Sequence, residues 1–275
     1  MERGRNAIVS ALGGLNKRAG LIPFVVAGDP NFEDSIEMLR ILCEYADVIE
    51  IGIPYSDPLA DGPAIQAGAA RSLSNGMNLS RAMELIQTVR SFSEVPIIAF
   101  TYANPVYKTG IAKFLSHARD AGADGVIIPD LPHEESEELR RELNRLEMAY
   151  VPLVSLTSGE RATRIAKTAT GFVYCVSTLG VTGERKSFAA QLPTLVSQVK
   201  ASSPVPVAVG FGVSHTDQVT ELSAYADGVI VGSAFVKYAG LLKEAAPENR
   251  AQILEAFRQF ASDLAGATNK GEKLV

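Results

Sequence analysis

Short apolar runs rich in valine, isoleucine, tyrosine and phenylalanine alternate with longer amphipathic stretches along the whole chain. This alternation is typical of repeated strand–helix units. Most runs are apolar on both faces, as expected of parallel strands that are covered on one side by helices and packed on the other. Eight strands are predicted, at Leu21–Ala27, Val48–Gly52, Pro96–Thr101, Gly125–Ile128, Tyr150–Leu156, Phe172–Val176, Pro206–Val209 and Gly228–Val231.

Helical spacing fills the stretches between these strands. Ile36 and Leu39 mark one amphipathic helix, and Leu139 and Leu143 mark another. Pro247 indicates the start of the last helix. We also expect a helix before the first strand, a short additional helix before the last helix, and a frayed tail at residues 266–275.

Eight strand–helix units without a Ser/Gly linker or a composition break predict one α/β domain over residues 1–275, folded as a closed (β/α)8 barrel. A doubly wound open sheet is the alternative. It would normally have fewer strands, and the first turn lacks the Gly-x-Gly-x-x-Gly fingerprint.

Charge and hydropathy exclude several classes of partner. The chain of 275 residues has 21% charged residues and a formal net charge of -5, so no basic excess attracts nucleic acid or acidic membranes. No apolar run approaches the roughly 18 residues that a membrane span needs. We therefore expect a cytoplasmic protein that binds neither nucleic acid nor membranes.

Cysteine and histidine positions give no sign of a disulfide or a metal site. Cys43 lies in a helical pattern and Cys175 in a strand pattern, both as core residues. His117, His133 and His215 lack metal-ligand spacing and are expected at the surface or at helix starts. We expect no metal ion.

Glu50 is the main candidate for chemistry. In a barrel, functional groups lie at the C-terminal ends of strands and in the loops that follow. Glu50 interrupts an apolar strand between Ile49 and Ile51, so its side chain should point into the barrel, where burial raises the pKa of a carboxyl group. Such a group can act as a general acid. The alternative is a Glu that is paired with a Lys or Arg.

The loop after this strand has two further carboxylates, and spacing alone does not rank them. Asp61 precedes Gly62 and Pro63 and, taken alone, would most simply be a helix N-cap. Asp57 precedes Pro58 and could equally form a turn.

Glycine-rich loops follow the last three strands and resemble a phosphate cradle. Glycine lets backbone N–H groups approach an anion, and a helix start adds a favourable dipole. Barrels often bind phosphate at this part of the rim. The candidate phosphate-binding residues are Gly183, Phe211, Gly212, Gly232 and Ser233. No lysine ends a strand in the position of a Schiff-base nucleophile, which disfavours covalent aldolase chemistry.

The chain closely resembles the α subunit family of tryptophan synthase. The run from Ile49 to Gly52 and the run from Tyr55 to Pro63 match the family signature without a gap. Further landmarks cover nearly the whole chain: Pro23-Phe24, Tyr102-Ala103-Asn104-Pro105, Asp130-Leu131-Pro132, Gly180-Val181-Thr182-Gly183, Gly210-Phe211-Gly212 and Gly232-Ser233. One departure is Ser155-Leu156-Thr157-Ser158, where the family often has a proline before its threonine.

The resemblance implies cofactor-free retro-aldol cleavage of indole-3-glycerol phosphate to indole and glyceraldehyde 3-phosphate, in tryptophan biosynthesis. It assigns proton transfer to Glu50 and stabilisation of the positive indole N–H to Asp61, and it makes Thr182 a lid residue that orients Asp61. Aromatic walls for the indole are expected from Phe24, Phe100, Tyr102 and Tyr174.

The same resemblance implies a β subunit as partner, in an α2β2 heterotetramer. Asp57, Asp130 and Pro132 would face that partner. Two other interpretations remain open: a free-standing indole-3-glycerol-phosphate lyase with the same catalytic residues, and a mainly non-catalytic activator of a β subunit.

Overall fold

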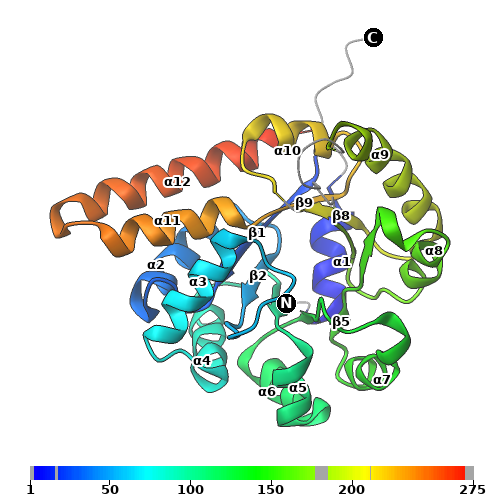
Figure 1. Cartoon of the computed structure of the whole chain (residues 1–275), viewed down its shortest axis with the longest axis horizontal. Coiled ribbons are helices and arrows are strands. Elements are labelled where there is room, and N and C mark those ends of the chain that lie inside the picture. Colours follow the sequence, from blue (N-terminus) through cyan, green and yellow to red (C-terminus); the bar gives the residue numbers. More distant parts are fainter. Residues whose placement is uncertain (1–2, 16–17, 177–184, 211, 270–275) are drawn as a thin grey trace.

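Parallel strands form the centre of the molecule and helices surround them (Figure 1). The computed structural model describes residues 3–15, 18–176, 185–210 and 212–269. The strands are β1 (Gly20–Val26), β2 (Ile49–Gly52), β3 (Ile97–Phe100), β4 (Gly125–Ile127), β5 (Ala149–Tyr150), β6 (Leu153–Ser155), β7 (Val173–Val176), β8 (Val207–Gly210) and β9 (Gly228–Val231).

The strand order closes into a barrel. Every pairing is parallel, and the order is β5-β4-β3-β2-β1-β9-β8-β7-β6. The two end members of this order, β5 and β6, are joined in the chain by Val151 and Pro152 alone. The chain itself therefore completes the ring, and the predicted (β/α)8 barrel is confirmed.

The fifth predicted strand differs from the observed structure because it is divided in two. Pro152 has no N–H to donate, so the strand cannot keep a continuous ladder across this point. On one side, Val151 N donates to Val126 O over 3.4 Å, and on the other, Tyr174 N donates to Pro152 O over 3.0 Å. Each half thus pairs with one neighbour, and eight predicted strands become nine.

The helices follow the strands around the outside of the barrel. They are α1 (Arg5–Gly13), α2 (Phe32–Leu42), α3 (Pro63–Ser74), α4 (Leu79–Arg90), α5 (Ala103–Thr109), α6 (Ile111–Ala121), α7 (Glu137–Arg145), α8 (Arg161–Ala166), α9 (Arg185–Ser202), α10 (Thr216–Ser223), α11 (Ser233–Glu244) and α12 (Arg250–Ala267), with 3-10 turns η1 (His133–Glu135), η2 (Leu156–Ser158) and η3 (Pro247–Asn249).

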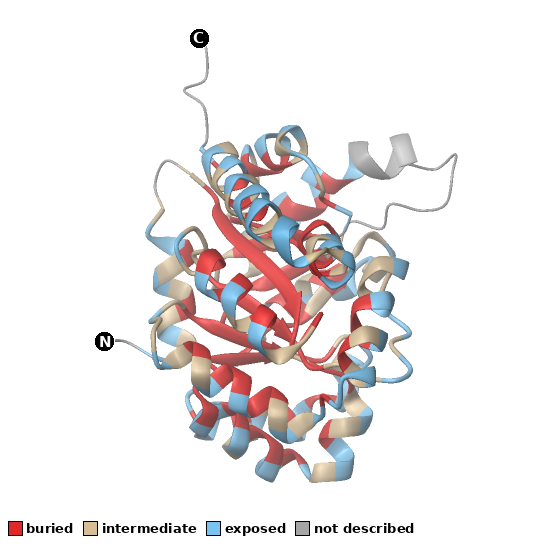
Figure 2. Cartoon of the chain, turned by 90° about the vertical axis from the view of Figure 1, so that its left-hand side faces the viewer, coloured by how far each residue is buried: buried red, intermediate tan, exposed pale blue. Residues whose placement is uncertain are grey.

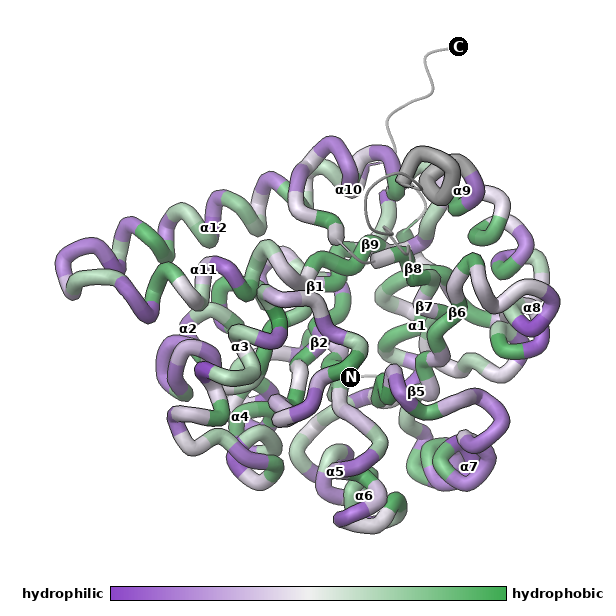
Figure 3. The backbone as a smooth tube through the Cα atoms, in the orientation of Figure 1, coloured by the Kyte–Doolittle hydropathy of each residue, from purple (hydrophilic) through white to green (hydrophobic). Residues whose placement is uncertain are grey.

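Two apolar layers hold this arrangement together. The larger one lies between the strands and the helices and includes Ile49 and Ile51 of β2. The second fills the inside of the barrel, and there Ile22, Ile98 and Phe172 are fully buried. Figure 2 shows buried strands inside helices whose outer surfaces are exposed, and Figure 3 shows the matching change from hydrophobic to hydrophilic residues. Alternate residues of a strand therefore face different layers.

The predicted N-terminal helix is confirmed, and it has a packing role. Ile8 and Leu12 of α1 belong to the same cluster as the residues inside the barrel. Figure 1 shows α1 within the outline of the ring. Because α1 supplies apolar side chains to the barrel interior, it closes the end opposite the C-terminal ends of the strands.

The C-terminal region has the predicted additional helix, but that helix is not short. It is α11, with 12 residues, and it packs against α3 and α12. After α12, Thr268 is buried and its carbonyl accepts a hydrogen bond from Ala19 N at 2.9 Å. Asn269 forms a bridge with Arg18. The described fold therefore extends to residue 269, and residues 270–275 of the predicted tail lie outside the described residues.

Candidate active site

A cavity of about 610 Å³ opens at the C-terminal ends of the strands. This is the edge of a barrel on which functional groups gather. Its lining consists of Phe24, Glu50, Ala60, Asp61, Gly62, Ile65, Phe100, Pro129, Leu153, Tyr174, Val176, Gly212, Ser214, His215, Gln218, Ile230, Gly232 and Ser233. The two predicted catalytic carboxyl groups therefore share one cavity.

Glu50 faces this cavity because of the alternation along β2. Ile49 and Ile51 belong to the outer apolar layer, so the side chain between them points into the barrel. In the sheet, Glu50 lies beside Phe24 of β1 and Ile98 of β3. Only 1% of Glu50 is exposed. The predicted inward orientation is thus what the structure shows.

The surroundings of Glu50 favour its protonated form. Its Oε1 atom has no hydrogen-bond partner, and no ion pair involves Glu50 in the described part of the chain. Burial raises the pKa of Glu50 to about 8. A carboxylic acid that keeps its proton at neutral pH can donate it to a bound substrate. The alternative of a Glu paired with a Lys or Arg finds no support among the described residues.

Asp61 lies in the loop between β2 and α3 and is not the helix cap that its position suggested. The N-cap of α3 is Gly62, with Pro63 in the first turn. Burial raises the pKa of Asp61 to about 6, and a hydrogen bond from the Tyr102 hydroxyl acts in the opposite direction. Asp61 is therefore mostly ionised at pH 7 and lies in the cavity with a protonated Glu50.

Tyr102 supports the Asp61 loop rather than forming part of the cavity wall. Its hydroxyl oxygen accepts a hydrogen bond from Ala60 N at 3.2 Å. Burial, and then the nearby charge of Asp61, raise the pKa of Tyr102. The hydroxyl thus stays protonated and can donate to the carboxylate. Of the four aromatic residues that we expected around the indole, Tyr102 alone is absent from the cavity lining.

The other three aromatic residues line the cavity. The ring centroids of Phe24 and Phe100 lie 5.3 Å apart in an edge-to-face contact. Tyr174 is buried, and burial raises the pKa of its hydroxyl well above the usual value. Gly52 makes room for Phe24, because a Cβ atom at Gly52 would lie 2.6 Å from the Phe24 ring. These rings give the cavity the flat apolar surfaces that an aromatic ligand needs.

Three of the five predicted phosphate-binding residues line the cavity: Gly212, Gly232 and Ser233. Gly212 has φ 75°, a backbone conformation that favours glycine. Gly232 is the N-cap of α11, and no side chain caps that helix. The N–H groups of the first turn are therefore not occupied by a cap, which suits an anion. Thr182, Gly183 and Phe211 lie outside the described residues.

Sequence reasoning missed several cavity residues. Ile65, Pro129, Leu153 and Ile230 are apolar and carry no chemical signal in the sequence. The polar residues Ser214, His215 and Gln218 form a second group. Ser214 ends the glycine-rich loop predicted after the seventh strand, residues 210–214, and His215 and Gln218 follow it. The expectation that His215 is a surface or capping residue is confirmed, because it is exposed and is the N-cap of α10.

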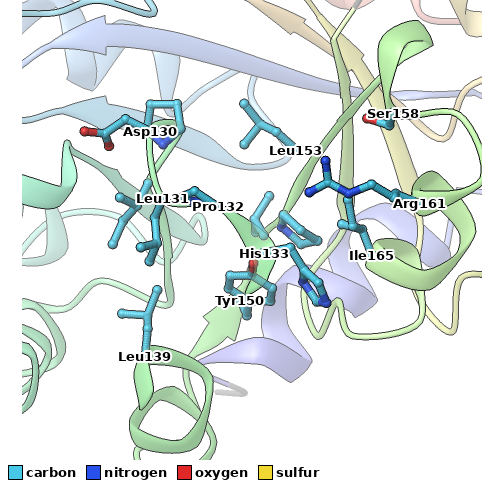
Figure 4. A pocket seen from close by; sticks show the side chains of 14 residues that line it. Asp130, Leu131, Pro132, His133, Leu139, Tyr150, Leu153, Ser158, Arg161 and Ile165 are labelled. Atoms are coloured by element: carbon cyan, nitrogen blue, oxygen red, sulfur yellow. The ribbon is translucent and has the colours of Figure 1, made fainter. Parts of the chain in front are cut away.

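The residues predicted to face a partner lie around a second, smaller pocket of about 230 Å³ (Figure 4). Asp130 and Pro132 line it and are exposed. Figure 4 shows the Asp130 carboxylate directed away from His133 and Arg161. It accepts a hydrogen bond from Ala103 N at 2.8 Å, at the start of α5. Asp57 lines neither pocket and is exposed, whereas Asp61 lines the larger cavity.

The described residues contain neither a metal-binding cluster nor a membrane-spanning helix. No group of three or more His, Cys, Asp or Glu side chains could hold a metal ion in the parts of the chain that are described. No helix there is long and apolar enough to cross a bilayer.

Comparisons with known proteins agree on one family. The model of the family described as "Tryptophan synthase alpha chain" matches residues 13–268. A tryptophan synthase alpha chain of Geobacillus stearothermophilus is 48% identical over 248 residues, which are 89% of this chain and 92% of the relative. That of Shouchella clausii is 47% identical over 247 residues, or 88% and 92% of the two chains.

Solved structures give the same result. A chain from tryptophan synthase of M. tuberculosis superimposes with a TM-score of 0.84 and 31% identity, covering 98% of this chain and 100% of that one. A chain from the tryptophan synthase complex of Pyrococcus furiosus gives 0.78 and 36%, with 91% and 99% covered. The matched residues include the strands, the cavity and the two carboxyl groups. The chain therefore belongs to the tryptophan synthase alpha chain family.

Proposed function

We propose that this chain cleaves indole-3-glycerol phosphate to indole and glyceraldehyde 3-phosphate by retro-aldol chemistry, as the α subunit of a tryptophan synthase. The observation that best supports this is Glu50: a buried carboxyl group with raised pKa, no ion-pair partner among the described residues, and an aromatic cavity beside it. Family membership supports the choice of substrate.

The reaction requires one proton to reach the ring and another to leave the substrate. Cleavage of the bond at indole C3 would directly release a poor carbanion, so C3 is protonated first. The Glu50 carboxylic acid donates this proton, and its conjugate base then accepts the proton of the adjacent substrate hydroxyl. As that hydroxyl becomes the aldehyde, the carbon–carbon bond breaks and its electron pair restores the aromatic ring. Glu50 ends in its starting protonation state.

Asp61 stabilises the positive charge that develops on the indole ring between the two proton transfers. Protonation at C3 leaves a positive indole ring, and an ionised carboxylate near the ring N–H stabilises that charge more than it stabilises the neutral substrate. We propose that Tyr102 keeps Asp61 ionised and in place. Thr182, which lies outside the described residues, would orient Asp61 when the loop after β7 closes.

The two pKa values define the pH range of this mechanism. Asp61 must be ionised, which requires a pH above about 6. Glu50 must be protonated, which requires a pH below about 8. A bell-shaped dependence of kcat/KM on pH is therefore expected, with its maximum near pH 7.

The substrate phosphate binds across the cavity, at the first turn of α11. Gly232 and Ser233 supply backbone N–H groups there, and Gly212 approaches from the loop after β8. We propose that Gly183 and Phe211, outside the described residues, complete this cradle.

A β subunit is the proposed partner, in an α2β2 heterotetramer. One relative of known structure is a chain of the tryptophan synthase complex of Pyrococcus furiosus. Asp57, Asp130 and Pro132 are exposed at the rim on which the cavity opens, and Leu59 in the same region is 81% exposed. An exposed leucine beside charged residues suits a protein interface. A cytoplasmic location fits this role.

Glu50→Gln is the deciding test. The amide keeps the size of the side chain but cannot transfer the proton, so kcat for indole release should fall by roughly 10²- to 10⁴-fold. Affinity for glycerol 3-phosphate should stay near that of the parent. Glu138→Gln, an exposed glutamate of α7, serves as the matched control. Near-normal turnover by Glu50→Gln would remove Glu50 from the mechanism.

A second experiment separates the three functional interpretations. Gel filtration with a β subunit should give a mixed complex, and that complex should release indole faster than the chain alone. Full activity alone without a mixed complex would indicate a free-standing lyase. A complex that makes no indole from indole-3-glycerol phosphate would indicate a non-catalytic activator.

A further inference from the structure

The first turn of α11, where the phosphate is proposed to bind, lies against α3 and the loop after β1. Figure 1 shows α3 and α11 side by side, and the two helices pack against each other. They come closest at Gly68 of α3, where a Cβ atom would lie 2.7 Å from the Val236 side chain and 2.8 Å from the Asp29 carboxylate. Val236 belongs to the first turn of α11, and Asp29 lies in the loop after β1. Three segments therefore meet beside the phosphate-binding turn.

Arg71 of α3 connects these three segments. Its Nε donates to Asp29 Oδ1 and its Nη2 to Asp29 Oδ2, both at 2.8 Å, so the ion pair is bidentate. The same Nη2 also donates to Val236 O at 3.3 Å. Asp29 is buried, and the Arg71 side chain is 23% exposed. A guanidinium group that Asp29 holds in one orientation therefore contacts the backbone of α11 within the turn that begins at Ser233.

This contact gives α11 a directional connection at its start. Val236 also packs in an apolar cluster with Phe24 and Val26. Apolar contacts are not directional, whereas a hydrogen bond depends on the angle at its donor. No side chain caps the first turn of α11. The bond from Arg71 to Val236 therefore helps to set the direction in which the first N–H groups of the helix point.

The other end of this contact, on α3, has further connections. The Ser72 hydroxyl donates to Ala27 O in the loop after β1. Gln66 Nε2 donates to Asp61 O at 2.8 Å, which ties the Asp61 loop to the start of α3. A change at Arg71 should therefore move the start of α11 and leave Asp61 in place.

We propose that Arg71 is a positioning residue for phosphate binding: its ion pair with Asp29 holds the first turn of α11 so that the N–H groups of Gly232 and Ser233 face the phosphate. This inference rests on the proposed function for the presence of a phosphate group. Arg71 is absent from the cavity lining, so it acts through α11 and not by contact with the substrate.

The test compares Arg71→Lys with Arg18→Lys in the full chain. Arg18 offers a matched control, because it binds Asp47 in the same bidentate way, at 2.7 and 2.6 Å, and also does not line the cavity. Lysine keeps the charge in both pairs but cannot form the two parallel hydrogen bonds. Affinity for glycerol 3-phosphate is measured by calorimetry, kcat and KM by indole release, and stability by urea unfolding.

Arg71→Lys should weaken glycerol 3-phosphate binding and raise KM by roughly threefold to tenfold, which is the effect of one hydrogen bond that loses its alignment. Its kcat should stay close to that of the parent, because Glu50 and Asp61 keep their places. Arg18→Lys should also lose stability, but its phosphate affinity and KM should match those of the parent.

The double variant Asp29→Asn/Arg71→Gln keeps the test decisive if a single change impairs folding. It removes both charges, so no uncompensated charge stays buried, and it lacks the guanidinium that reaches Asp29 and Val236 together. Its phosphate affinity should fall as it does in Arg71→Lys. Parent affinity in both Arg71 variants, or an equal loss of affinity in Arg18→Lys, would overturn the proposal.

The outcome is separable from the proposed function. If the parent binds glycerol 3-phosphate but releases no indole, the proposed reaction fails while the calorimetric test of Arg71 still applies. If the parent releases indole and both Arg71 variants have the parent's KM and phosphate affinity, only the assignment of Arg71 fails.

Discussion

Glu50 and Asp124 are both carboxyl groups with 1% exposure, and they lie at opposite ends of the barrel. Asp124 directly precedes β4, at the end that α1 closes. It accepts hydrogen bonds from Arg3 Nε at 2.9 Å, Arg90 Nη2 at 2.8 Å, and the backbone N–H groups of Gly4 and Ile97 at 2.8 and 2.9 Å. Glu50 has an oxygen with no partner at all.

This contrast separates a structural carboxylate from a chemical one. Burial of a charge is tolerated where cations and N–H groups replace water, and there it connects distant segments. Asp124 joins the N-terminal segment to α4 and β3 in this way. Where no such groups are present, burial favours the neutral acid instead, and the proton becomes available for transfer. Burial alone therefore does not identify a catalytic carboxyl group. Burial without ion-pair or hydrogen-bond partners is a much stronger indication of one.

The largest effect that tests this comparison is the pH dependence of stability. Below pH 4.5, Glu50 is protonated in both the folded and the unfolded chain. Between pH 4.5 and about 8, the unfolded chain loses this proton while the folded chain keeps it, so the free energy of unfolding falls as pH rises. At about 1.4 kcal/mol per pKa unit, the total loss is on the order of 5 kcal/mol.

Urea unfolding of the parent and of Glu50→Gln, measured between pH 5 and 8.5, isolates this contribution. The amide does not titrate, so the variant should gain stability over the parent steadily up to about pH 8 and no further. Glu138→Gln should show no such trend, because that side chain is exposed. A constant difference between parent and Glu50→Gln across the range would contradict the raised pKa of Glu50.

The opposite end of the barrel should respond in stability rather than in chemistry. Asp124→Asn removes the charge between Arg3 and Arg90, and breaking a buried pair in this way should lower the free energy of unfolding by about 3 kcal/mol. The kcat of the folded variant should match that of the parent, because Asp124 does not line the cavity. Equilibrium unfolding and an indole-release assay check the two parts. A large loss of kcat without loss of stability would reverse the roles assigned to the two carboxyl groups.

The barrel could be predicted from the sequence because its signal is repeated. Each of the eight predicted strands overlaps an observed strand, since apolar runs of this kind are buried on both faces wherever they occur. The division of the fifth strand was not predicted, although Pro152 was visible. A proline marks a point where a ladder can break, but whether it breaks depends on the two neighbouring strands.

The site was predictable only in part. Glu50 could be identified because a lone charge in an apolar strand is a local signal. For Asp61, spacing alone left a helix N-cap as the simplest role, and the structure excludes it because Gly62 is the N-cap of α3 and Asp61 lies in the loop. His215 is an exposed N-cap, as expected, but its place in the cavity lining was not predicted, because that depends on how the strands assemble. Such information comes from several strands at once and has no single place in the sequence.

The smallest expected effect concerns the hydroxyl of Tyr102. This group donates to Asp61, which holds the pKa of Asp61 below the value that burial alone would give, and it accepts from Ala60 N. In Tyr102→Phe the ring remains, but the pKa of Asp61 rises above about 6. The acid limb of the kcat/KM profile should therefore move to higher pH, and kcat/KM at pH 7 should fall roughly threefold to tenfold.

The basic limb of that profile belongs to Glu50 and should stay near pH 8. Tyr55→Phe is the matched control, because the Tyr55 ring lies 5.4 Å from Tyr102 but its hydroxyl accepts from Asn104 Nδ2. A shift of the basic limb in Tyr102→Phe, or an equal shift of the acid limb in Tyr55→Phe, would contradict the assignment. The two carboxyl groups of the cavity would then titrate as one unit. The distinction drawn between a proton donor and a charge stabiliser would have to be replaced by a shared proton.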